Sequence, residues 1–233
     1  MKSVKSGHEV ASGNHPHIES HHEGNEALFC LVHDGECGVT VEVHANPEEQ
    51  KFLEQGLHEA ISHLDVYFDG KFAELCKGLE IEVGDGLTDG GGEAFGEENK
   101  IVLDRQKMLM SVSDEDKLLA ELGFADEGDR LRALPPELHG MSAAVYELVH
   151  EVGHIVEERA DLHLPAEERL KRASNMAYLS PTNLYKQDPN RPQEAFAEAF
   201  AYKVFGKKIN EELGAIVDRT IEDFLASRDI IKT

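Results

Sequence analysis

The chain contains no tryptophan, few other aromatic residues and few cationic side chains, and these shortages narrow the classes of protein to which it can belong. Of its 233 residues, 23 are Lys or Arg and 46 are Asp or Glu, which gives a net charge of −23 at neutral pH. A field of that sign repels phosphate, so we expect neither nucleic acid nor an anionic membrane surface as a partner. The apolar fraction of 40% is nevertheless that of a folded protein and argues against a disordered chain.

Long apolar runs are also lacking. No run approaches the roughly 20 residues that a membrane-spanning helix needs, and residues 27–32 form one of the longest. The first 20 residues carry Lys2 and Lys5 without an apolar stretch behind them, so we expect no secretory signal in the chain. The expected location is therefore the cytoplasm, and secretion is the alternative.

Cysteine is scarce, with only Cys30, Cys37 and Cys76 in the chain. An odd number at low density does not predict a disulfide framework, and we expect free thiols in a reducing compartment. A single bridge between Cys30 and Cys37 is the alternative. Because no CxxC or CxxH spacing occurs, we do not expect the cysteines to hold a metal.

The first 26 residues are polar and rich in histidine, and they show no periodic apolar face. Because such a segment cannot bury enough surface to offset its ordering entropy, we predict a disordered tail over residues 1–26. A tail that collects metal ions is the alternative interpretation. The remaining residues, 27–233, are expected to form a single domain.

Apolar alternation and capping residues predict the elements of this domain. Strands are expected over residues 27–32, 38–43, 79–83 and 100–104, and helices over residues 47–64, 114–122, 142–161, 166–177, 192–205 and 209–227. Residues 84–96 contain six glycines and predict a flexible hairpin loop. Since most strands precede most helices, we expect an α+β fold with a strand-rich half over residues 27–112 and a helical half over residues 113–233.

The most informative segment is HEVGH at residues 150–154, an HExxH pattern in a predicted helix that is otherwise largely apolar. Residues four apart share one face of a helix, with Cβ atoms about 5–6 Å apart, so His150 and His154 can reach one zinc ion. Glu151 would then lie beside the metal without binding it, and it is the candidate general base. Gly153 weakens a helix by about 1 kcal/mol relative to alanine, which predicts a close approach of backbone or metal.

An internal comparison is offered by His58 and His63, which are five residues apart in another predicted helix. Glu59 follows His58 just as Glu151 follows His150. Five helical steps separate two side chains by about 140°, so these two histidines cannot share one metal ion. We expect both of them at the surface.

Candidates for a third zinc ligand lie in the helix that begins near Pro192. Glu194 and Glu198 are four residues apart, and the neighbouring positions are mostly Ala and Phe. Two carboxylates on a buried face need cationic or metal partners. We expect one glutamate to bind the metal and the other to orient a ligand histidine. Ion pairs with Arg or Lys are the alternative.

The segments HEVGH and EAFAEAF resemble the catalytic domain of anthrax lethal factor and the Pro-Pro endopeptidases, which are zinc peptidases of the zincin type. The resemblance is close over these two helices and elsewhere extends only to the order of elements. It implies that His150, His154 and Glu194 bind zinc, that Glu151 is the base and that Glu198 supports the site. It also implies a zincin-like fold, in which a small mixed sheet with a helix and a helical half flank an active-site cleft.

The family also has a tyrosine in the loop before the third ligand, where it hydrogen-bonds the oxyanion of the intermediate. The family spacing of seven residues falls on Gln187 in this chain. Tyr185, nine residues before Glu194, is our candidate for that role, and Tyr178 or another group is the alternative. The resemblance also places the edge strand that pairs with an extended peptide at residues 100–104, although a core strand fits the same sequence.

The sequence, read with this resemblance, predicts a zinc-dependent endopeptidase that acts on a peptide or protein substrate and uses Zn²⁺ as its cofactor. The alternative is a non-catalytic zincin-fold protein with a binding or structural role, such as a toxin or phage component. The departure at Gln187 favours that alternative. A metal-buffering protein built on the histidine-rich tail is a third interpretation. The acidic charge favours a basic or neutral peptide as substrate, but it equally favours solubility.

Overall fold

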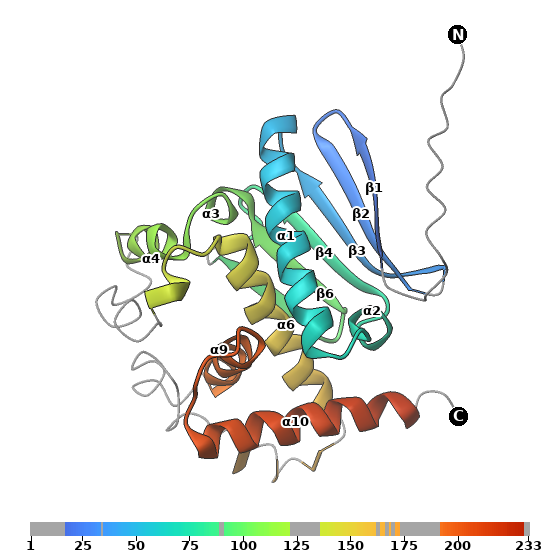
Figure 1. Cartoon of the computed structure of the whole chain (residues 1–233), viewed down its shortest axis with the longest axis vertical. Helices are drawn as coiled ribbons and strands as arrows, with labels where there is room; N and C mark the ends of the chain where they lie inside the picture. Colours follow the sequence, from blue (N-terminus) through green and yellow to red (C-terminus); the bar gives the residue numbers. More distant parts are fainter. Residues whose placement is uncertain are drawn as a thin grey trace.

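The computed structural model describes residues 17–33, 35–88, 91–121, 136–161, 164–165, 168, 171–172 and 192–230. These residues form an α+β structure in which helices pack on a mixed six-stranded sheet (Figure 1). The strands are β1 (His17–Glu23), β2 (Glu26–His33), β3 (Glu36–His44), β4 (Leu79–Gly84), β5 (Gly92–Phe95) and β6 (Lys100–Asp104). The helices are α1 (Pro47–Tyr67), α2 (Phe72–Leu75), α3 (Arg105–Met108), α4 (Val112–Glu121), α6 (Ala143–Asp161), α9 (Pro192–Val204) and α10 (Glu211–Ile230), with a 3₁₀ turn at Pro136–Leu138.

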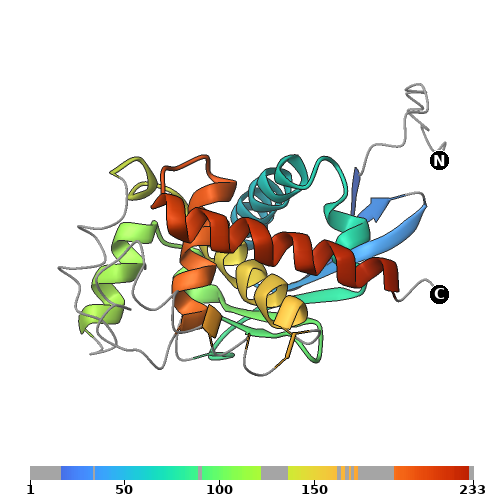
Figure 2. The ribbon, with the colours of Figure 1, turned by 90° about the horizontal axis from the view of Figure 1, so that it is seen from below.

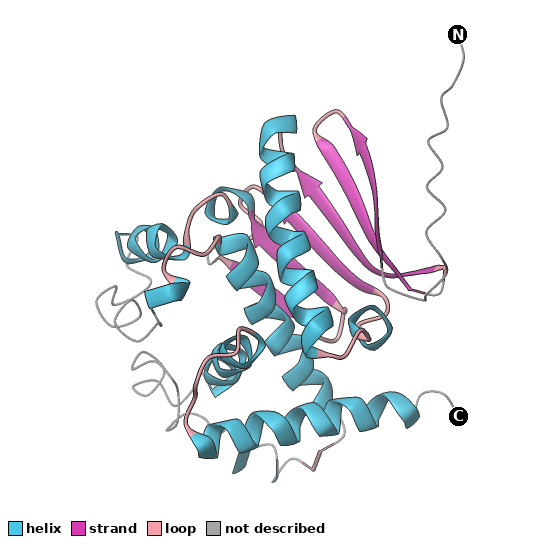
Figure 3. Ribbon diagram, viewed as in Figure 1, coloured by secondary structure: helices cyan, strands magenta, loops and turns pink. Residues whose placement is uncertain are grey.

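The strand order of the sheet is β1-β2-β3-β4-β6-β5. Strands β1, β2 and β3 form an antiparallel meander, β3, β4 and β6 run parallel, and β5 runs antiparallel to β6. Helix α1 connects β3 to β4 and lies across the sheet (Figure 3). The strand at residues 100–104 is therefore an inner strand, and the prediction that it forms an edge is wrong. Within the described residues that edge is β5.

Two strands lie where the sequence predicts none. The predicted tail over residues 1–26 is wrong from residue 17 onward, because β1 pairs with β2 along its whole length, from His17 opposite Val32 to Glu23 opposite Glu26. Most side chains of β1 are exposed, so main-chain pairing orders it with little apolar burial. Residues 1–16 lie outside the described residues. Strand β5 occupies part of the glycine-rich segment that predicts a flexible loop.

The other predicted strands are confirmed, and so are five of the predicted helices, with shifts of a few residues at their ends. The two helices that were not predicted, α2 and α3, have four residues each, too few for an apolar period to be recognised. The predicted helix at residues 166–177 lies mostly outside the described residues. Apart from β1, which lies in the predicted tail, the described strands fall in the half predicted to be strand-rich, although this half also contains the long helix α1.

Cys30 and Cys37 form a disulfide with their Cα atoms 5.7 Å apart, so the expectation of free thiols is wrong for this pair. The pairing of β2 with β3 brings the two cysteines together next to a register shift between Leu31 and Val32. Such a register is a tertiary property that cysteine counting does not reveal. Cys76 is buried in the core.

The core lies between one face of the sheet and the helices, and α6 is its centre. Helix α6 packs against α1, α9, α10 and β5. Figure 2 shows α1, α6 and α10 on the same side of the sheet. Small residues permit close helix contacts, since a Cβ on Gly56 of α1 would lie 3.0 Å from Ala144 of α6. None of the described helices is both long and apolar enough to cross a membrane.

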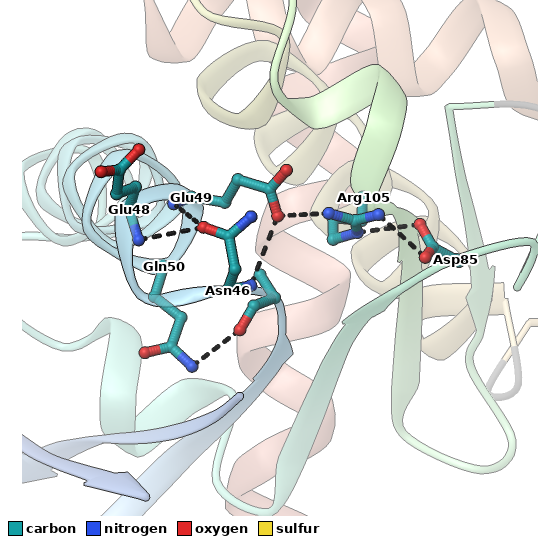
Figure 4. A network of polar contacts seen from close by, with 7 residues as sticks. Asn46, Glu48, Glu49, Gln50, Asp85 and Arg105 are labelled. Carbon is teal, nitrogen blue, oxygen red and sulfur yellow. Dashed lines mark hydrogen bonds and ion pairs between the residues drawn. The ribbon is translucent and has the colours of Figure 1, made fainter. Parts of the chain in front are cut away.

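A polar network joins the start of α1 to the sheet (Figure 4). Asn46 caps α1 by accepting hydrogen bonds from the backbone N–H groups of Glu48 and Glu49, at 3.0 and 3.1 Å. Arg105, the first residue of α3 directly after β6, donates two hydrogen bonds to Asp85, at 2.8 and 2.9 Å, and pairs with Glu49. The network thus fixes the residue that follows β4, from which the chain continues toward β5.

The contact between α6 and α9 gives a stability prediction for Gly153. Its substitution by alanine would place a Cβ 2.8 Å from Ala197 Cα. We expect Gly153→Ala to lower the free energy of unfolding by about 1–3 kcal/mol, because overpacking outweighs the gain in helix propensity. Urea denaturation measures the change.

Gly214→Ala in α10 is the matched control, since its Cβ would meet Ile209 at an ordinary 3.6 Å. This variant should raise the free energy of unfolding by up to about 1 kcal/mol. Equal stabilisation by both variants would contradict the close contact at Gly153.

Candidate metal centre

Helix α6 carries the HExxH residues in a largely apolar environment. Val149 and Val152 are fully buried, and His150 and Glu151 are buried between them. The side chain of His154 is 16% exposed. A helix with so many apolar residues packs inside the core, and its polar side chains lose water when it does. Polar partners must therefore come from neighbouring elements.

Two helices bring three ligand atoms to one point. Nε2 of His150 lies 3.2 Å from Nε2 of His154, as the spacing of four residues predicts. Oε2 of Glu194, from α9, lies 3.4 Å from the first nitrogen and 3.7 Å from the second. Ligands about 2.0–2.1 Å from a tetrahedral zinc ion are about 3.3–3.4 Å apart. The three atoms therefore have close to the spacing of a zinc site.

Helix α9 can approach α6 so closely because small residues face each other. Gly153 of α6 meets Ala197 of α9, so the prediction of a close backbone approach at this glycine is confirmed. Helix α9 begins at Pro192, which places Glu194 in its first turn. Ala195 and Phe196 are fully buried and fix the helix in the core. The carboxylate of Glu194 is thereby held next to the histidines.

Glu151 lies beside these atoms and under strand β5. A Cβ on Gly92 of β5 would lie 2.7 Å from Cγ and 2.8 Å from Oε1 of Glu151. One ligand atom each of His150, Glu151 and His154 lies within 4.8 Å of the other two. The predicted base is thus between the two histidines and the backbone of the edge strand.

Burial raises the pKa of Glu151 to about 7. The charges of His154 and His150 act in the opposite direction, and those of Glu147 and Glu194 add to the increase. A carboxyl group with this pKa exchanges a proton near neutral pH, which suits a general acid or base.

At Glu194 and His154, the charges of the site oppose the effect of burial on the pKa. Burial disfavours the ionised form of Glu194, but hydrogen bonds and charges from His150 and His154 hold the pKa of this carboxyl well below its usual range. Burial also lowers the pKa of His154, but a hydrogen bond to Glu194 and the charges of Glu151, Glu194 and Glu157 raise it to about 9. The site therefore favours positive charge at its centre.

The chemistry of the ligand groups of His150, His154 and Glu194 indicates whether a metal ion fits the site. Two imidazole nitrogens and one carboxylate oxygen form a catalytic zinc donor set, which leaves a fourth position open. The negative charges of Glu151 and Glu194 next to the histidines would be balanced by a dication. Nδ1 of His150 is buried and has no hydrogen-bond partner in the part of the chain that the structure describes. The residues present thus fit zinc, although one ligand histidine lacks the supporting hydrogen bond usual in such sites.

The remaining predicted site residues are only partly placed. Glu198 is buried one turn after Glu194. Because Nδ1 of His150 has no partner among the described residues, Glu198 does not support that histidine, and a bond to His154 stays a prediction. Tyr185 and the alternative Tyr178 lie outside the described residues, so the oxyanion role also stays a prediction.

Sequence reasoning missed two residues of this region. Gly92 contacts Glu151, but its place in a run of glycines suggests a loop. Glu157, near the end of α6, is buried, and this burial raises its pKa to about 7 against the charge of His154. Its position three residues after His154, on nearly the same helix face, is a signal that could have revealed it.

Comparisons of the chain with protein-family models, with curated proteins and with solved structures found no match. The case for a function therefore depends on the geometry and chemistry of α6, α9 and β5.

The raised pKa of Glu151 predicts a pH-dependent stability in protein stripped of metal by a chelator. Since the folded-state pKa is about 7 against an ordinary 4.5, the folded protein retains a proton that the unfolded chain releases. This stabilisation is complete below pH 4.5 and is lost as the pH rises through 7. Wild type should lose up to about 3 kcal/mol more than Glu151→Gln over this interval.

Urea unfolding at intervals between pH 4.5 and 8 tests this expectation. Glu59→Gln is the control, because the exposed Glu59 also follows a histidine in a helix, and it should keep the wild-type slope. Parallel curves for wild type and Glu151→Gln would show that Glu151 is not desolvated.

Proposed function

We propose that this chain is a zinc-dependent endopeptidase with a zincin-like fold. The observation that carries the proposal is the convergence of His150, His154 and Glu194 from two helices, with distances of 3.2, 3.4 and 3.7 Å between their ligand atoms. Glu151 lies beside them with a pKa of about 7. This is the arrangement that Glu-assisted hydrolysis at a metal centre requires.

The chain supplies the ligands and the base of the proposed reaction. His150 and His154 would hold zinc through Nε2, and Glu194 would hold it through Oε2. Zinc, when bound, supplies a Lewis acid that polarises a carbonyl oxygen and lowers the pKa of a water molecule to about 7. The buried Val149 and Val152 limit the access of other water to the site.

Glu151 would carry the proton. One of its carboxylate oxygens accepts the proton of the water that attacks the scissile carbonyl, and the same group then delivers that proton to the leaving nitrogen. Burial raises the pKa of this carboxyl to about 7 in the metal-free chain, and a bound dication would lower it, which would leave the carboxylate ionised and able to accept the proton. Tyr185 remains the candidate for hydrogen-bonding the oxyanion.

Strand β5 takes the role that the resemblance gives to residues 100–104. It is the edge strand of the described sheet on the side of α6, and an extended peptide can add to such an edge through main-chain hydrogen bonds. The contact of Gly92 with Glu151 would bring that peptide next to the base. Gly96, just after β5, donates its N–H to Oε2 of Glu158 at 2.9 Å, which fixes the strand to α6. We propose a peptide or protein chain as the substrate.

Replacement of the base tests the proposal directly. Glu151→Gln should keep the fold and the zinc but lose about 10²–10⁴-fold in activity, because the amide preserves the shape and cannot accept the proton. Cleavage of a peptide library, followed by mass spectrometry, measures the activity, and elemental analysis measures the zinc. His154→Ala is the control and should lose both.

Unchanged activity in Glu151→Gln would remove this residue from the mechanism. Zinc-loaded wild-type protein that cleaves no member of the library would favour the non-catalytic alternative, a binding or structural protein that retains the metal site.

Two glutamates of α9 compete for the role of third ligand, and their alanine variants should differ. Glu194→Ala should be nearly free of zinc at micromolar protein, because the carboxylate next to both histidines is lost. Glu198→Ala should still bind zinc, with an affinity about 10–100-fold lower if it orients a ligand histidine. Zinc titration of both variants measures the difference. A zinc-free Glu198→Ala beside a zinc-bound Glu194→Ala would move the third ligand one turn along the helix.

A further inference from the structure

The face of the sheet that points away from the long helices is rich in carboxylates. Figure 2 shows α1, α6 and α10 on one side of the sheet, and alternate strand residues such as Phe29, Val41 and Ile81 are buried in the core on that side. The residues between them point to the other side, which we call the acidic face. The acidic residues at these outward positions include Glu19, Glu26, Glu42, Glu80, Glu82 and Glu93.

The strand register aligns side chains of the acidic face into rows across the sheet. Glu42 of β3 lies opposite Glu82 of β4, and Leu28 of β2 lies opposite Glu42 on its other side. Like charges on directly opposite residues destabilise a sheet, so this row favours a cation beside it. Leu28 is 45% exposed and the side chain of Glu42 is 50% exposed. The described residues therefore leave this row open to solvent.

The sheet supplies few cations of its own to balance these charges. Lys100 is the only lysine or arginine in the six described strands, and its Nζ lies 2.7 Å from Oε2 of Glu82. Nε2 of His44 lies 3.2 Å from Oε1 of Glu42 and 4.0 Å from Oε1 of Glu82, but an imidazole is charged only when it is protonated. Carboxylates therefore outnumber fixed positive charges on the acidic face.

Lys100 shows which chemical group this face stabilises. The hydrogen bond from its ammonium to Glu82 raises the pKa of Lys100 above its ordinary value, and the charges of Glu82, Glu80 and Glu98 act in the same direction against the effect of burial. The acidic face thus already holds an ammonium group that belongs to the chain itself. The side chains of Glu42 and Glu80, on neighbouring strands, offer the same chemistry to an ammonium or guanidinium group from outside.

From this charge complementarity we propose that the acidic face is a docking surface for a segment of a partner polypeptide that is rich in lysine and arginine. Its dimensions suit a segment, because six strands about 4.8 Å apart span roughly 24 Å, which about seven extended residues can cross. The aliphatic stems of lysine and arginine can lie on the exposed Leu28 while their charged ends reach Glu42 and Glu80.

This surface is separate from the site on α6 and α9, and it does not depend on the proposed function. Glu42 and Glu80 belong to β3 and β4, which are the two central strands of the sheet, whereas a substrate would add to the edge at β5. Their side chains also point away from the core in which α6 is buried. A partner on the acidic face could thus be bound while the candidate metal centre is empty.

The test measures the affinity of the full-length chain for a fluorescently labelled octalysine peptide by fluorescence anisotropy at physiological ionic strength. The double variant Glu42→Lys, Glu80→Lys should bind the peptide at least about tenfold more weakly than wild type, because each change removes an attraction and adds a repulsion. The double variant Glu59→Lys, Glu222→Lys is the matched control, since it has the same net charge and alters exposed residues of α1 and α10. It should weaken binding by less than about threefold, because salt screens distant charges.

The double variant Glu42→Gln, Glu80→Gln preserves the shape of both side chains, so weaker binding in this variant reports lost charge and not misfolding. It should bind octalysine at least about twofold more weakly than wild type. Equal weakening by the two lysine double variants would overturn the proposal, because the peptide would then respond to net charge alone. Wild-type affinity in Glu42→Gln, Glu80→Gln would also overturn it, as would a wild-type chain that does not bind octalysine.

Discussion

Helices α6 and α9 touch at Gly153 and Ala197, where a Cβ on the glycine would lie 2.8 Å from the alanine Cα. His154 is the next residue of α6, and Glu194 lies about one turn before Ala197 on α9. At this helix separation the Glu194 carboxylate is 3.4 and 3.7 Å from the two imidazole nitrogens. A bulkier residue at either contact position would move α9 outward and take the carboxylate beyond the reach of a shared metal ion. The approach of two backbones therefore determines whether the three ligands can act together.

The charges on α6 explain why such a site needs a cation. His150, Glu151 and Glu157 are buried in a helix whose other residues are mostly apolar. Ionised groups lose hydration there, and they remain stable only if they take up protons or find a partner of opposite charge. In the absence of a metal, protons fulfil this role, which is why the pKa values of Glu151 and Glu157 rise to about 7 and that of His154 to about 9. A dication would replace those protons and leave Glu151 ionised, as a general base requires.

The parts of the site that follow from local geometry were predictable from the sequence. A spacing of four residues on a helix fixes the relation of His150 to His154 whatever surrounds them. The helix of Glu194 was predictable from Pro192 at its start and from its apolar residues. Its place beside α6 came from the resemblance, because helix packing is a tertiary property.

The misses share a physical cause, since each depends on pairing with another strand. Strand β1 is ordered by pairing with β2, and its own polar residues do not predict that pairing. The strand at residues 100–104 became an inner strand because a glycine-rich segment pairs with it. Local periodicity contains no information on such contacts.

The two edges of the sheet differ in a way that agrees with the proposed function. Strand β1 has seven residues, and its exposed side chains include His17, Glu19 and His21, which discourage pairing with a second chain. Strand β5 has only four residues and begins with Gly92. A short edge limits aggregation but still offers main-chain groups to an extended peptide. The glycine also lets the backbone lie against Glu151, where any side chain would displace the base. The edge that could receive a substrate is thus the one whose sequence keeps the backbone accessible and close to the catalytic carboxylate.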